Sequence, residues 1–352
     1  MEAAPPISKR GPWPAWQFVL GFALAVVLLG GLAEGYLRLF PPRDLYPYLG
    51  EDCPLTGIYK PDDDFSVTYQ SWEALRDDNA DRLRAYLPLG ADAGGRRLWA
   101  FFGNSFVQAP GMLADHTRAG VPDHRIFNLG RNEHLFLRLA QIKLLLENGL
   151  RPERVFVALM PVDVTGLGAQ PLATNHVTAR GALTYEQPRR AGPLGWLVRH
   201  SRLALAASVR SGRQQGNPRF RSGRLYEGVE EPLLGDLRRL FDNLARVARE
   251  HGVPVTVLLI PAYHQVRWGA SCGFQDTLAP VLRQQGYDVF DPRDAFRSQP
   301  DPDGLFIPDK HFSPRGNQVL LAELLKHLRS AGVPPAPSTL RAGRPRSEAG
   351  VP

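Results

Sequence analysis

From about residue 96 the chain alternates between short apolar runs and longer amphipathic segments. Apolar runs without polar alternation are typical of strands covered on both faces, and apolar residues at helical spacing are typical of helices that bury one face. Strands that alternate with helices predict an α/β fold around a central parallel sheet. The predicted strands are 96–103, 125–130, 154–161, 253–261 and 286–292, and the predicted helices are 133–149, 232–252 and 313–330.

A second hydrophobic pattern occupies the start of the chain. Trp13–Ala33 carries no charge and is long enough to cross a bilayer, for which about 20 apolar residues suffice. Aromatic side chains lie near both of its ends, as they do at membrane interfaces. We therefore expect a transmembrane anchor at 13–36. Two alternatives stay open: a cleaved signal peptide, which usually has a shorter apolar region, and a buried helix of a soluble protein.

The charges beside this segment give only a weak preference for one orientation. Lys9 and Arg10 precede it, and Arg38 and Arg43 follow it. A short N-terminal tail before a single span is typical of an export signal. We therefore expect residues 1–12 in the cytoplasm and the rest of this single-pass chain in the periplasm or outside the cell.

Composition divides the remaining chain into further segments. A stretch rich in Pro, Asp and aromatic residues follows the anchor, and an Arg-rich insertion separates the third and fourth predicted strands. The insertion is expected to be a solvated cap, or alternatively a surface for anionic lipid headgroups or an acidic glycan. The expected segments are a juxtamembrane stalk or packing segment at 37–95, an α/β domain at 96–330 with the insertion at about 165–230, and a disordered tail at 331–352.

The overall composition narrows the classes of partner. The 352 residues carry a net charge of +7, which would suit nucleic acid, anionic lipid or an acidic substrate. The sequence has no nucleic-acid motif, zinc-ligand spacing or phosphate-binding loop, so we expect neither nucleic acid nor a metal or other cofactor. Cys53 and Cys272 lie in the part expected outside the cytoplasm. A disulfide between them and two unpaired thiols both stay open.

The first candidate for chemistry is Ser105, in the stretch "FFGNSFVQAP". It follows the first predicted strand, and active sites of open parallel sheets gather at the carboxyl ends of the strands. A serine at such a position is usually a helix cap. Its sequence therefore raises the question of whether it is a cap or a nucleophile.

A nucleophilic serine needs a base, and the base needs an orienting group. The segment "IPDKHFSPRG" offers both, because Asp309 and His311 are two residues apart just before the last predicted helix. In an extended segment such side chains point the same way. The carboxylate would then reach one ring nitrogen of His311 and leave the other facing Ser105.

Four stretches in this order resemble the SGNH (GDSL-type) hydrolase family: Gly103–Ser105, "FNLG", "VFVALMPVDV" and "DKHFSPRGN". The likeness covers about 96–330, and "EGYLRLFPP" is similar to the end of the span in membrane-anchored bacterial members. The resemblance implies a flavodoxin-like three-layer sandwich with an esterase or acyltransferase centre. In it, Ser105 would be the nucleophile, His311 the base and Asp309 its partner. The Asp-x-His spacing resembles relatives that O-acetylate exopolysaccharides.

The sequence departs from the family pattern at three positions. Asn104 stands where the family usually has Asp, and Glu133 stands where it usually has an oxyanion-hole Gly. The third block usually has an Asn before Asp163, and here that residue is Val162. Two of the three family oxyanion donors therefore do not line up. Losing one such donor costs about 10²–10³ in rate.

Other groups nearby are candidates to complete the site. The Ser105 N–H would remain as an oxyanion donor, and the amides of Asn104 or Asn132 could replace the missing donors. We place Gly130 and Asp163 with these amides as oxyanion or substrate-binding residues, although Asp163 would equally order a loop.

Three further polar residues near the expected sheet edge have ordinary alternatives. His264 could line the pocket or replace His311 as base, or lie on a surface loop. Arg131 could hold an anionic group, and Glu133 could act as an acid or base, but both suit a first helical turn.

These observations lead to two functional hypotheses. The first is a membrane-anchored extracytoplasmic serine esterase or O-acyltransferase that acts on acyl, such as acetyl, esters of envelope or secreted polysaccharide. The second is a catalytically degenerate SGNH-like domain that binds glycan or scaffolds a membrane complex. The expected partners are an acylated glycan or other ester substrate, the membrane, and a membrane protein.

Overall fold

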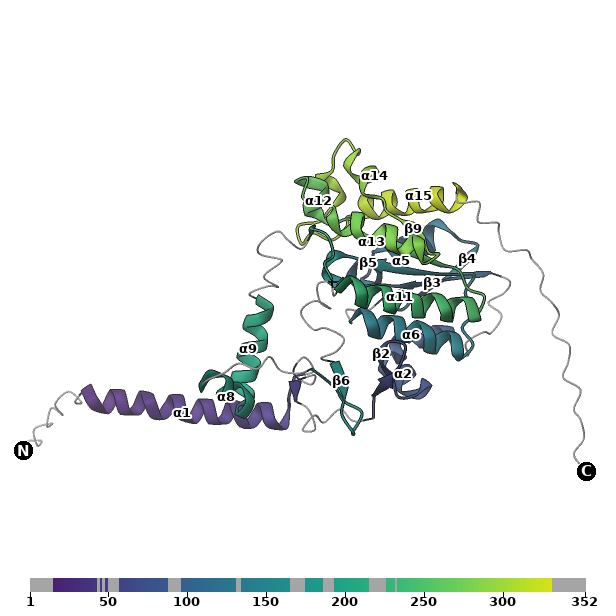
Figure 1. The fold of residues 1–352 in the computed structure, drawn as a ribbon. Coiled ribbons are helices and arrows are strands. Elements are labelled where there is room, and N and C mark those ends of the chain that lie inside the picture. Colours follow the sequence, from purple (N-terminus) through teal and green to yellow (C-terminus); the bar gives the residue numbers. More distant parts are fainter. Residues whose placement is uncertain are drawn as a thin grey trace, which may run out of the picture.

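The centre of the computed structural model is a five-stranded parallel sheet (Figure 1). Its spatial order is β4-β3-β5-β8-β9, and every neighbouring pair is parallel. Counted along the chain, this is the order 2-1-3-4-5 of flavodoxin-like folds, which confirms the expected fold class. The strands are β3 (Arg97–Phe102), β4 (His124–Asn128), β5 (Arg154–Leu159), β8 (Val255–Leu259) and β9 (Asp288–Phe290).

The structure describes only part of the chain. The terminal segments 1–12 and 331–352 lie outside the described residues, as do Cys53, Arg131, Asn132 and Glu133. The described residues are 15–42, 45, 48–49, 57–87, 96–130, 134–164, 175–185, 193–214, 226–231 and 233–330.

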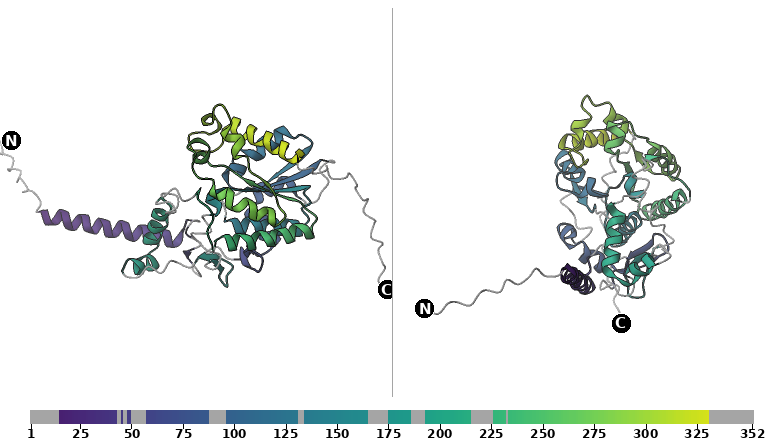
Figure 2. Two further views of the ribbon diagram at one scale, coloured as in Figure 1. Left: turned by 45° about the horizontal axis from the view of Figure 1, so that its top comes forward. Right: turned by 90° about the vertical axis from the view of Figure 1, so that its left-hand side faces the viewer.

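Helices cover both faces of the sheet (Figure 2). Every residue of β5 and β8 is buried, which explains why these strands read as uninterrupted apolar runs. The three predicted helices are present as α6, α11 and α15. One face carries α6 (Leu135–Glu147), α11 (Leu233–Glu250) and α13 (Gly273–Gln284), and the other carries α5 (Leu113–Gly120), α14 (Arg293–Arg297) and α15 (Pro314–Ser330).

A small N-terminal unit packs on the α6 side of the sandwich. Phe65, Val67 and Tyr69 are fully buried in the same core as α6. The Lys143 ammonium adds ion pairs of 3.1 and 2.8 Å to Asp62 and Asp64. This unit comprises an antiparallel hairpin, β1 (Tyr59–Asp62) and β2 (Ser66–Tyr69), then α2 (Trp72–Asp78), α3 (Ala80–Leu83) and the 3₁₀ turn Arg84–Tyr86.

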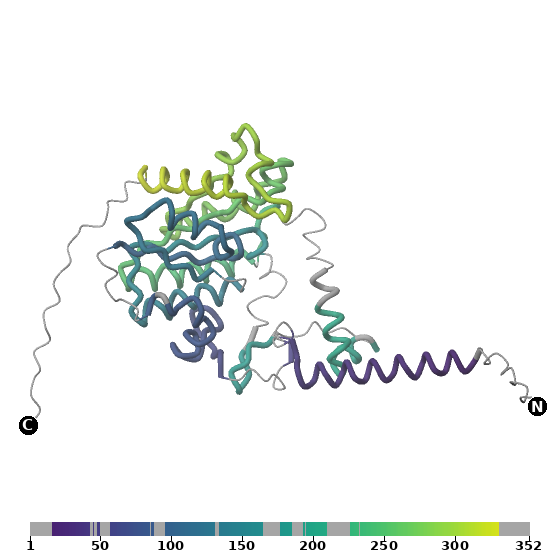
Figure 3. The backbone as a smooth tube through the Cα atoms, turned by 180° about the vertical axis from the view of Figure 1, so that it is seen from behind, coloured from purple at the N-terminus to yellow at the C-terminus, as the bar shows by residue number. Residues whose placement is uncertain are grey.

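A long apolar helix, α1 (Ala15–Leu39), runs away from the sandwich (Figure 3). Trp16–Leu39 is long and apolar enough to cross a membrane, with a mean hydropathy of 2.1, and lies near the N-terminus. A membrane anchor and a signal sequence both fit this helix.

The two described helices of the Arg-rich insertion lie beside α1, whereas its hairpin bonds to Gly57 and Tyr59 of the N-terminal unit. Two of its helices contact the C-terminal third of α1 through Glu34 and Arg38. The insertion contains the hairpin strands β6 (Asn175–Val177) and β7 (Leu183–Tyr185), and the helices α8 (Pro193–His200) and α9 (Arg202–Gln214).

Candidate active site

Ser105 lies at the carboxyl end of β3, which is an interior strand between β4 and β5. The chain turns sharply at Gly103, where a Cβ atom would lie 2.4 Å from a methyl group of Val107 and 3.0 Å from the Cβ of Ala158 on β5. Only glycine fits this approach. The turn leads directly into the one-turn helix α4 (Ser105–Gln108) and leaves Ser105 at the point where the strand order reverses.

Asn104, not Ser105, is the helix cap. The Oδ1 of Asn104 accepts a hydrogen bond of 3.1 Å from the Phe106 N–H, and Ser105 is the first helical residue. The Nδ2 of Asn104 donates to Asp163 at 3.1 Å. Asn104 therefore fixes the turn on both sides, which leaves the Ser105 hydroxyl available for a different role.

A tight turn presents Asp309 and His311. The Ile307 N–H donates to the His311 carbonyl at 2.9 Å, and the Lys310 N–H donates to the Ile307 carbonyl at 2.8 Å. Lys310 adopts a left-handed conformation with φ of 73°, as the third residue of a three-residue hairpin loop often does. The segment is thus a turn, and our expectation of an extended segment was wrong.

This turn and α4 bring the three predicted side chains together. His311 Nε2 lies 2.7 Å from Ser105 Oγ, and His311 Nδ1 lies 3.2 Å from Asp309 Oδ1. The Phe106 ring stacks on the imidazole, with centroids 4.7 Å apart. The same carboxylate oxygen accepts the His311 backbone N–H at 3.0 Å. That backbone hydrogen bond, with smaller effects of the imidazole, lowers the pKa of Asp309.

The helix that follows, α15, fixes the position of this turn. The Ser313 Oγ accepts from the Gly316 N–H at 3.1 Å and so caps α15. A Cβ atom at Gly316 would lie 2.2 Å from the Leu305 carbonyl oxygen. Glycine therefore lets the first turn of α15 sit against Leu305, just behind His311.

Asp163 joins the ends of the neighbouring strands β3 and β5. Its Oδ2 accepts from Asn104 Nδ2 at 3.1 Å and from the Met160 N–H at 2.8 Å. Its Oδ1 accepts from Arg138 Nη2 of α6 at 3.1 Å. The Arg138 side chain is 1% exposed and that of Asp163 is 6% exposed. These contacts order the loops that hold Ser105.

Arg138 was not anticipated as part of the site. It lies within "EHLFLRLAQIKLLLENG", a helix in which most side chains are apolar. A charged residue on the buried stripe of such a helix is expected to have a partner. This was the available sequence signal, and it did not say which carboxylate the partner would be.

The remaining expected oxyanion groups are placed less favourably or lie outside the described residues. The Gly130 N–H donates to Asn128 Oδ1 at 3.0 Å. Val162 has no side-chain donor and is 48% exposed. Asn132 and Glu133 lie in the undescribed segment 131–133, directly after Gly130.

His264 does not contact Ser105 among the described interactions but lies beside the turn that carries His311. Its Nδ1 is 2.8 Å from the Tyr226 hydroxyl, and its Nε2 is 3.3 Å from the Lys310 ammonium. Burial and the Lys310 charge lower the pKa of His264. The imidazole of His264 therefore favours the neutral form, and its side chain packs next to the turn that carries His311.

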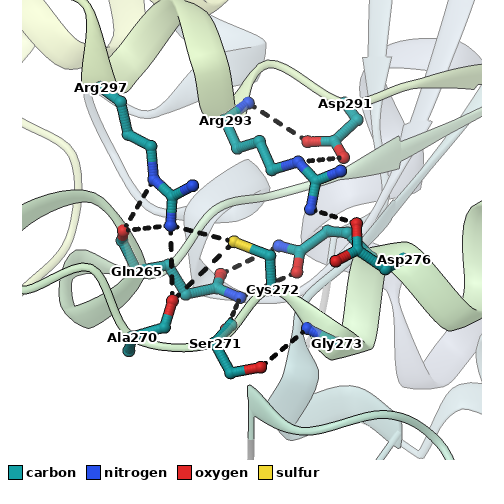
Figure 4. Close-up of polar contacts among 10 residues, drawn as sticks. Gln265, Ala270, Ser271, Cys272, Gly273, Asp276, Asp291, Arg293 and Arg297 are labelled. Carbon is teal, nitrogen blue, oxygen red and sulfur yellow. Dashed lines mark hydrogen bonds and ion pairs between the residues drawn. The ribbon is translucent and has the colours of Figure 1, made fainter.

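The helix that carries His264 is held in place by a buried amide pair and by Arg297, which contacts Gln265 and Cys272 (Figure 4). Gln265 and Gln275 exchange hydrogen bonds of 2.8 and 2.9 Å. Arg297 donates to the Gln265 carbonyl and lies 3.1 Å from the Cys272 sulfur. These contacts fix α12 (Tyr263–Arg267) against α13 and α14. Among the described residues, no group of three His, Cys, Asp or Glu side chains is arranged to hold a metal ion.

Comparison with known proteins gives structural likenesses alone. No family model and no curated protein matches the chain. TesA is 14% identical, with 66% of this chain and 99% of TesA covered and a TM-score of 0.40. A putative SGNH hydrolase from Slackia heliotrinireducens is 12% identical over 66% of this chain and 99% of its own, with a TM-score of 0.38.

A putative acylhydrolase from Bacteroides fragilis is likewise 12% identical, with 74% of this chain and 98% of the acylhydrolase covered and a TM-score of 0.39. Similarities this low assign no activity to the chain. Its function is therefore argued from its own residues.

Proposed function

We propose that the protein is a serine esterase or O-acyltransferase with Ser105, His311 and Asp309 as its triad. The observation that carries the proposal is the 2.7 Å contact between Ser105 Oγ and His311 Nε2, with Asp309 on the opposite ring nitrogen. A serine hydroxyl becomes nucleophilic when a base accepts its proton and a third group holds that base. Residues from distant parts of the chain meet here at the sheet edge where such sites form.

The proposed reaction has two halves. His311 Nε2 takes the proton of Ser105 as its Oγ attacks an ester carbonyl carbon, and His311 then returns the proton to the leaving alcohol. The acyl group remains on Ser105. Water or a sugar hydroxyl next loses its proton to His311 and attacks the acyl carbon, and the proton returns to Ser105 Oγ. Water gives hydrolysis, and the sugar gives transfer.

The proposed setting is outside the cytoplasm, with α1 as an uncleaved anchor. The length and apolar character of α1 support it. Polysaccharides of the envelope are acyl-bearing polymers in that setting. The Asp309-x-His311 spacing, which resembles that of exopolysaccharide O-acetylating relatives, favours acetyl esters as substrates.

Specific contacts also favour the degenerate, glycan-binding alternative. Asn104 Nδ2 donates to Asp163, and the Gly130 N–H donates to Asn128. Val162 replaces the expected amide donor. An oxyanion hole supplies much of the rate of acyl transfer, so a site in which these groups point elsewhere would bind an ester without turning it over.

Labelling with a fluorophosphonate probe tests the triad. Full-length protein in detergent is expected to be labelled covalently, and Ser105→Ala and His311→Ala are expected to lose the label. Ser298→Ala and His251→Ala, which change the same residue types away from the site, are the matched controls and should label normally. Unlabelled wild type that is folded by circular dichroism would reject the esterase in favour of the binding hypothesis.

A second measurement separates hydrolysis from transfer. Wild type that has not been exposed to the probe would be given an acetylated polysaccharide, with and without an unacetylated acceptor polysaccharide. Free acetate without acceptor indicates hydrolysis, and acetate that moves to the acceptor indicates transfer. Release of neither product, despite probe labelling, would contradict the proposed acetyl substrate but not the triad.

A further inference from the structure

The corner between α8 and α9 is locked onto α1 by a carboxylate. Glu34 of α1 accepts hydrogen bonds of 2.9 Å from the Ser201 hydroxyl and from the backbone N–H groups of Arg202 and Leu203. These N–H groups open α9, so Glu34 caps a helix that is not its own. Arg38 pairs with Glu34 at 2.9 Å and donates to the His200 carbonyl, at the end of α8, at 3.0 Å.

Apolar packing continues this attachment. Leu205 and Ala206 of α9 are buried in a small cluster with Leu45 and Leu49 from the segment after α1. Leu37 of α1 packs against the same cluster. The two helices and the end of α1 therefore form one packed unit.

The position of Glu34 places this unit at one end of the apolar segment. Trp13–Ala33 has no charged residue, and Glu34 follows it immediately. The part of α1 that lies within this stretch, residues 15–33, is about 28 Å long at roughly 1.5 Å per residue, close to the roughly 30 Å hydrocarbon thickness of a bilayer. If α1 crosses a membrane, Glu34 and the α8–α9 corner therefore lie where hydrocarbon meets headgroups.

The direction of α9 agrees with a position at the membrane surface. In Figures 1 and 3, α9 crosses α1 at a steep angle, and the sandwich lies beyond the C-terminal end of α1. A helix that crosses a membrane-spanning helix in this way lies along the membrane surface. Amphipathic helices bind there with an apolar face toward the acyl chains and arginines toward the phosphates.

The side chains around the α8–α9 corner combine exposed apolar groups with arginines. Trp196, Leu197 and Leu203 are 57%, 44% and 42% exposed. No acidic residue lies between 187 and 225, whereas arginine recurs throughout that stretch. Exposed apolar side chains in a segment whose charged residues are all basic complement an anionic phospholipid surface.

We propose that the α8–α9 corner is a membrane-surface foot, with Trp196, Leu197 and Leu203 at the acyl boundary and its arginines on anionic headgroups. Because the foot is bonded to α1 at Glu34, it is held at the level where α1 leaves the membrane. This inference rests on the proposed anchor but not on the triad.

Site-specific fluorophores on the full chain test the foot. In a background with Cys53→Ser and Cys272→Ser, an environment-sensitive dye would be placed at Leu197→Cys or Leu203→Cys. Leu87→Cys, which directly follows the 3₁₀ turn Arg84–Tyr86 of the N-terminal unit and is 39% exposed, is the matched control, and Phe22→Cys reports on α1. Each protein is reconstituted in vesicles of phosphatidylcholine with and without phosphatidylglycerol.

The dyes at 197 and 203 are expected to be quenched by spin-labelled lipid and shielded from aqueous iodide. The dye at 87 is expected to be quenched by iodide and not by the lipid. Glu34→Ala should remove the shielding at 197 and leave the dye at 22 in lipid. Shielding should weaken without phosphatidylglycerol, because the arginines lose their counter-charges.

Iodide quenching at 197 equal to that at 87 would overturn the foot. Shielding that appears only when an acidic polysaccharide is added would replace the lipid with a glycan. Iodide quenching at position 22 would reject the anchor and the foot together. Probe labelling of Ser105 in the same vesicles would still report on the triad, so the two failures can be told apart.

Discussion

At the scale of single residues, the exposure of Asp309 distinguishes the proposed triad from one with a buried aspartate. Its carboxylate is 64% exposed and shares one oxygen between the His311 backbone N–H and the imidazole. Water screens an exposed carboxylate, so it orients and stabilises the imidazolium less strongly than a buried one does. Most of the orientation of His311 therefore comes from the turn and from the stacked ring of Phe106.

Asp309→Asn tests this view. Replacing a buried triad aspartate by asparagine costs about 10⁴ in kcat. Here we expect a loss of roughly 10–10², because backbone contacts still hold His311. The rate of probe labelling measures it. Asp303→Asn, an exposed carboxylate paired with Arg267, is the control, and a loss near 10⁴ would show that Asp309 dominates the orientation of His311.

Lys310 holds the other unusual position of the turn. Its φ of 73° is uncommon for a residue other than glycine, asparagine or aspartate and strained for a β-branched one. Lys310→Asn should keep stability and labelling, whereas Lys310→Val should lower the free energy of unfolding by about 1–3 kcal/mol and slow labelling. Both variants lack the ammonium, so their difference in urea titrations isolates the backbone. Equal behaviour would contradict a role for the left-handed turn.

At the scale of elements, Arg138 connects α6 to the ends of β3 and β5. Removing one partner of a buried ion pair typically costs 3–5 kcal/mol, because the other charge stays buried. Arg138→Met should therefore lower the free energy of unfolding by about that amount, and should slow probe labelling because Asp163 no longer holds Asn104 firmly.

Arg118→Met is the matched control. Arg118 forms an exposed pair with Asp115 on α5, and its loss should cost under about 1 kcal/mol. The double variant Arg138→Met, Asp163→Asn should recover part of the stability but not the labelling rate. Recovery of both would mean that Asp163 does not order the turn that carries Ser105.

The sequence predicted the five strands of the central sheet and the helices α6, α11 and α15, and missed α13 and several short elements. β5 and α11 were visible because an apolar run and a helical apolar stripe each follow from burial. The hairpin β1–β2 and the helix α12 are too short to show a period, and tertiary contacts such as the Gln265–Gln275 pair define them. Pairwise spacing suggested Asp309 and His311, but the left-handed Lys310 that joins them left no pattern in the sequence.

At the scale of the whole molecule, the two edges of the sheet carry different chemistry. The carboxyl edge holds Ser105, and the opposite edge holds a polar cluster around Asp288 at the start of β9. Asp288 lies 2.6 Å from His327 Nε2 and accepts from Thr256 at 2.8 Å and Arg154 at 3.3 Å. Because this cluster joins β5, β8, β9 and α15 far from the site, it should affect stability alone.

The pKa of Asp288 gives this stability a pH dependence. Burial raises that pKa, but hydrogen bonds from His327 and Thr256 and the nearby charges lower it overall. A carboxylate with a lowered pKa in the folded state adds stability above its ordinary pKa, and the contribution is lost as pH falls through the lowered value. The free energy of unfolding should thus decline below about pH 4.

Asp288→Asn should be less stable at neutral pH and should decline less in acid, while its probe labelling matches wild type. Urea titrations between neutral and acidic pH measure both slopes. Parallel wild-type and variant curves would exclude Asp288 as a source of the acid sensitivity.

The bond between Glu34 and the start of α9 also dictates an order of events during synthesis. The two partners are separated by 167 residues for Ser201 and by 169 for Leu203. When α1 leaves the ribosome, the groups that will satisfy its carboxylate do not yet exist, and the first three strands of the sheet are made before them. Non-local contacts of this kind close late. If α1 crosses a membrane as proposed, Glu34 stays in water or among headgroups until that late contact forms, and its charge opposes a deeper position of the nascent helix in the bilayer.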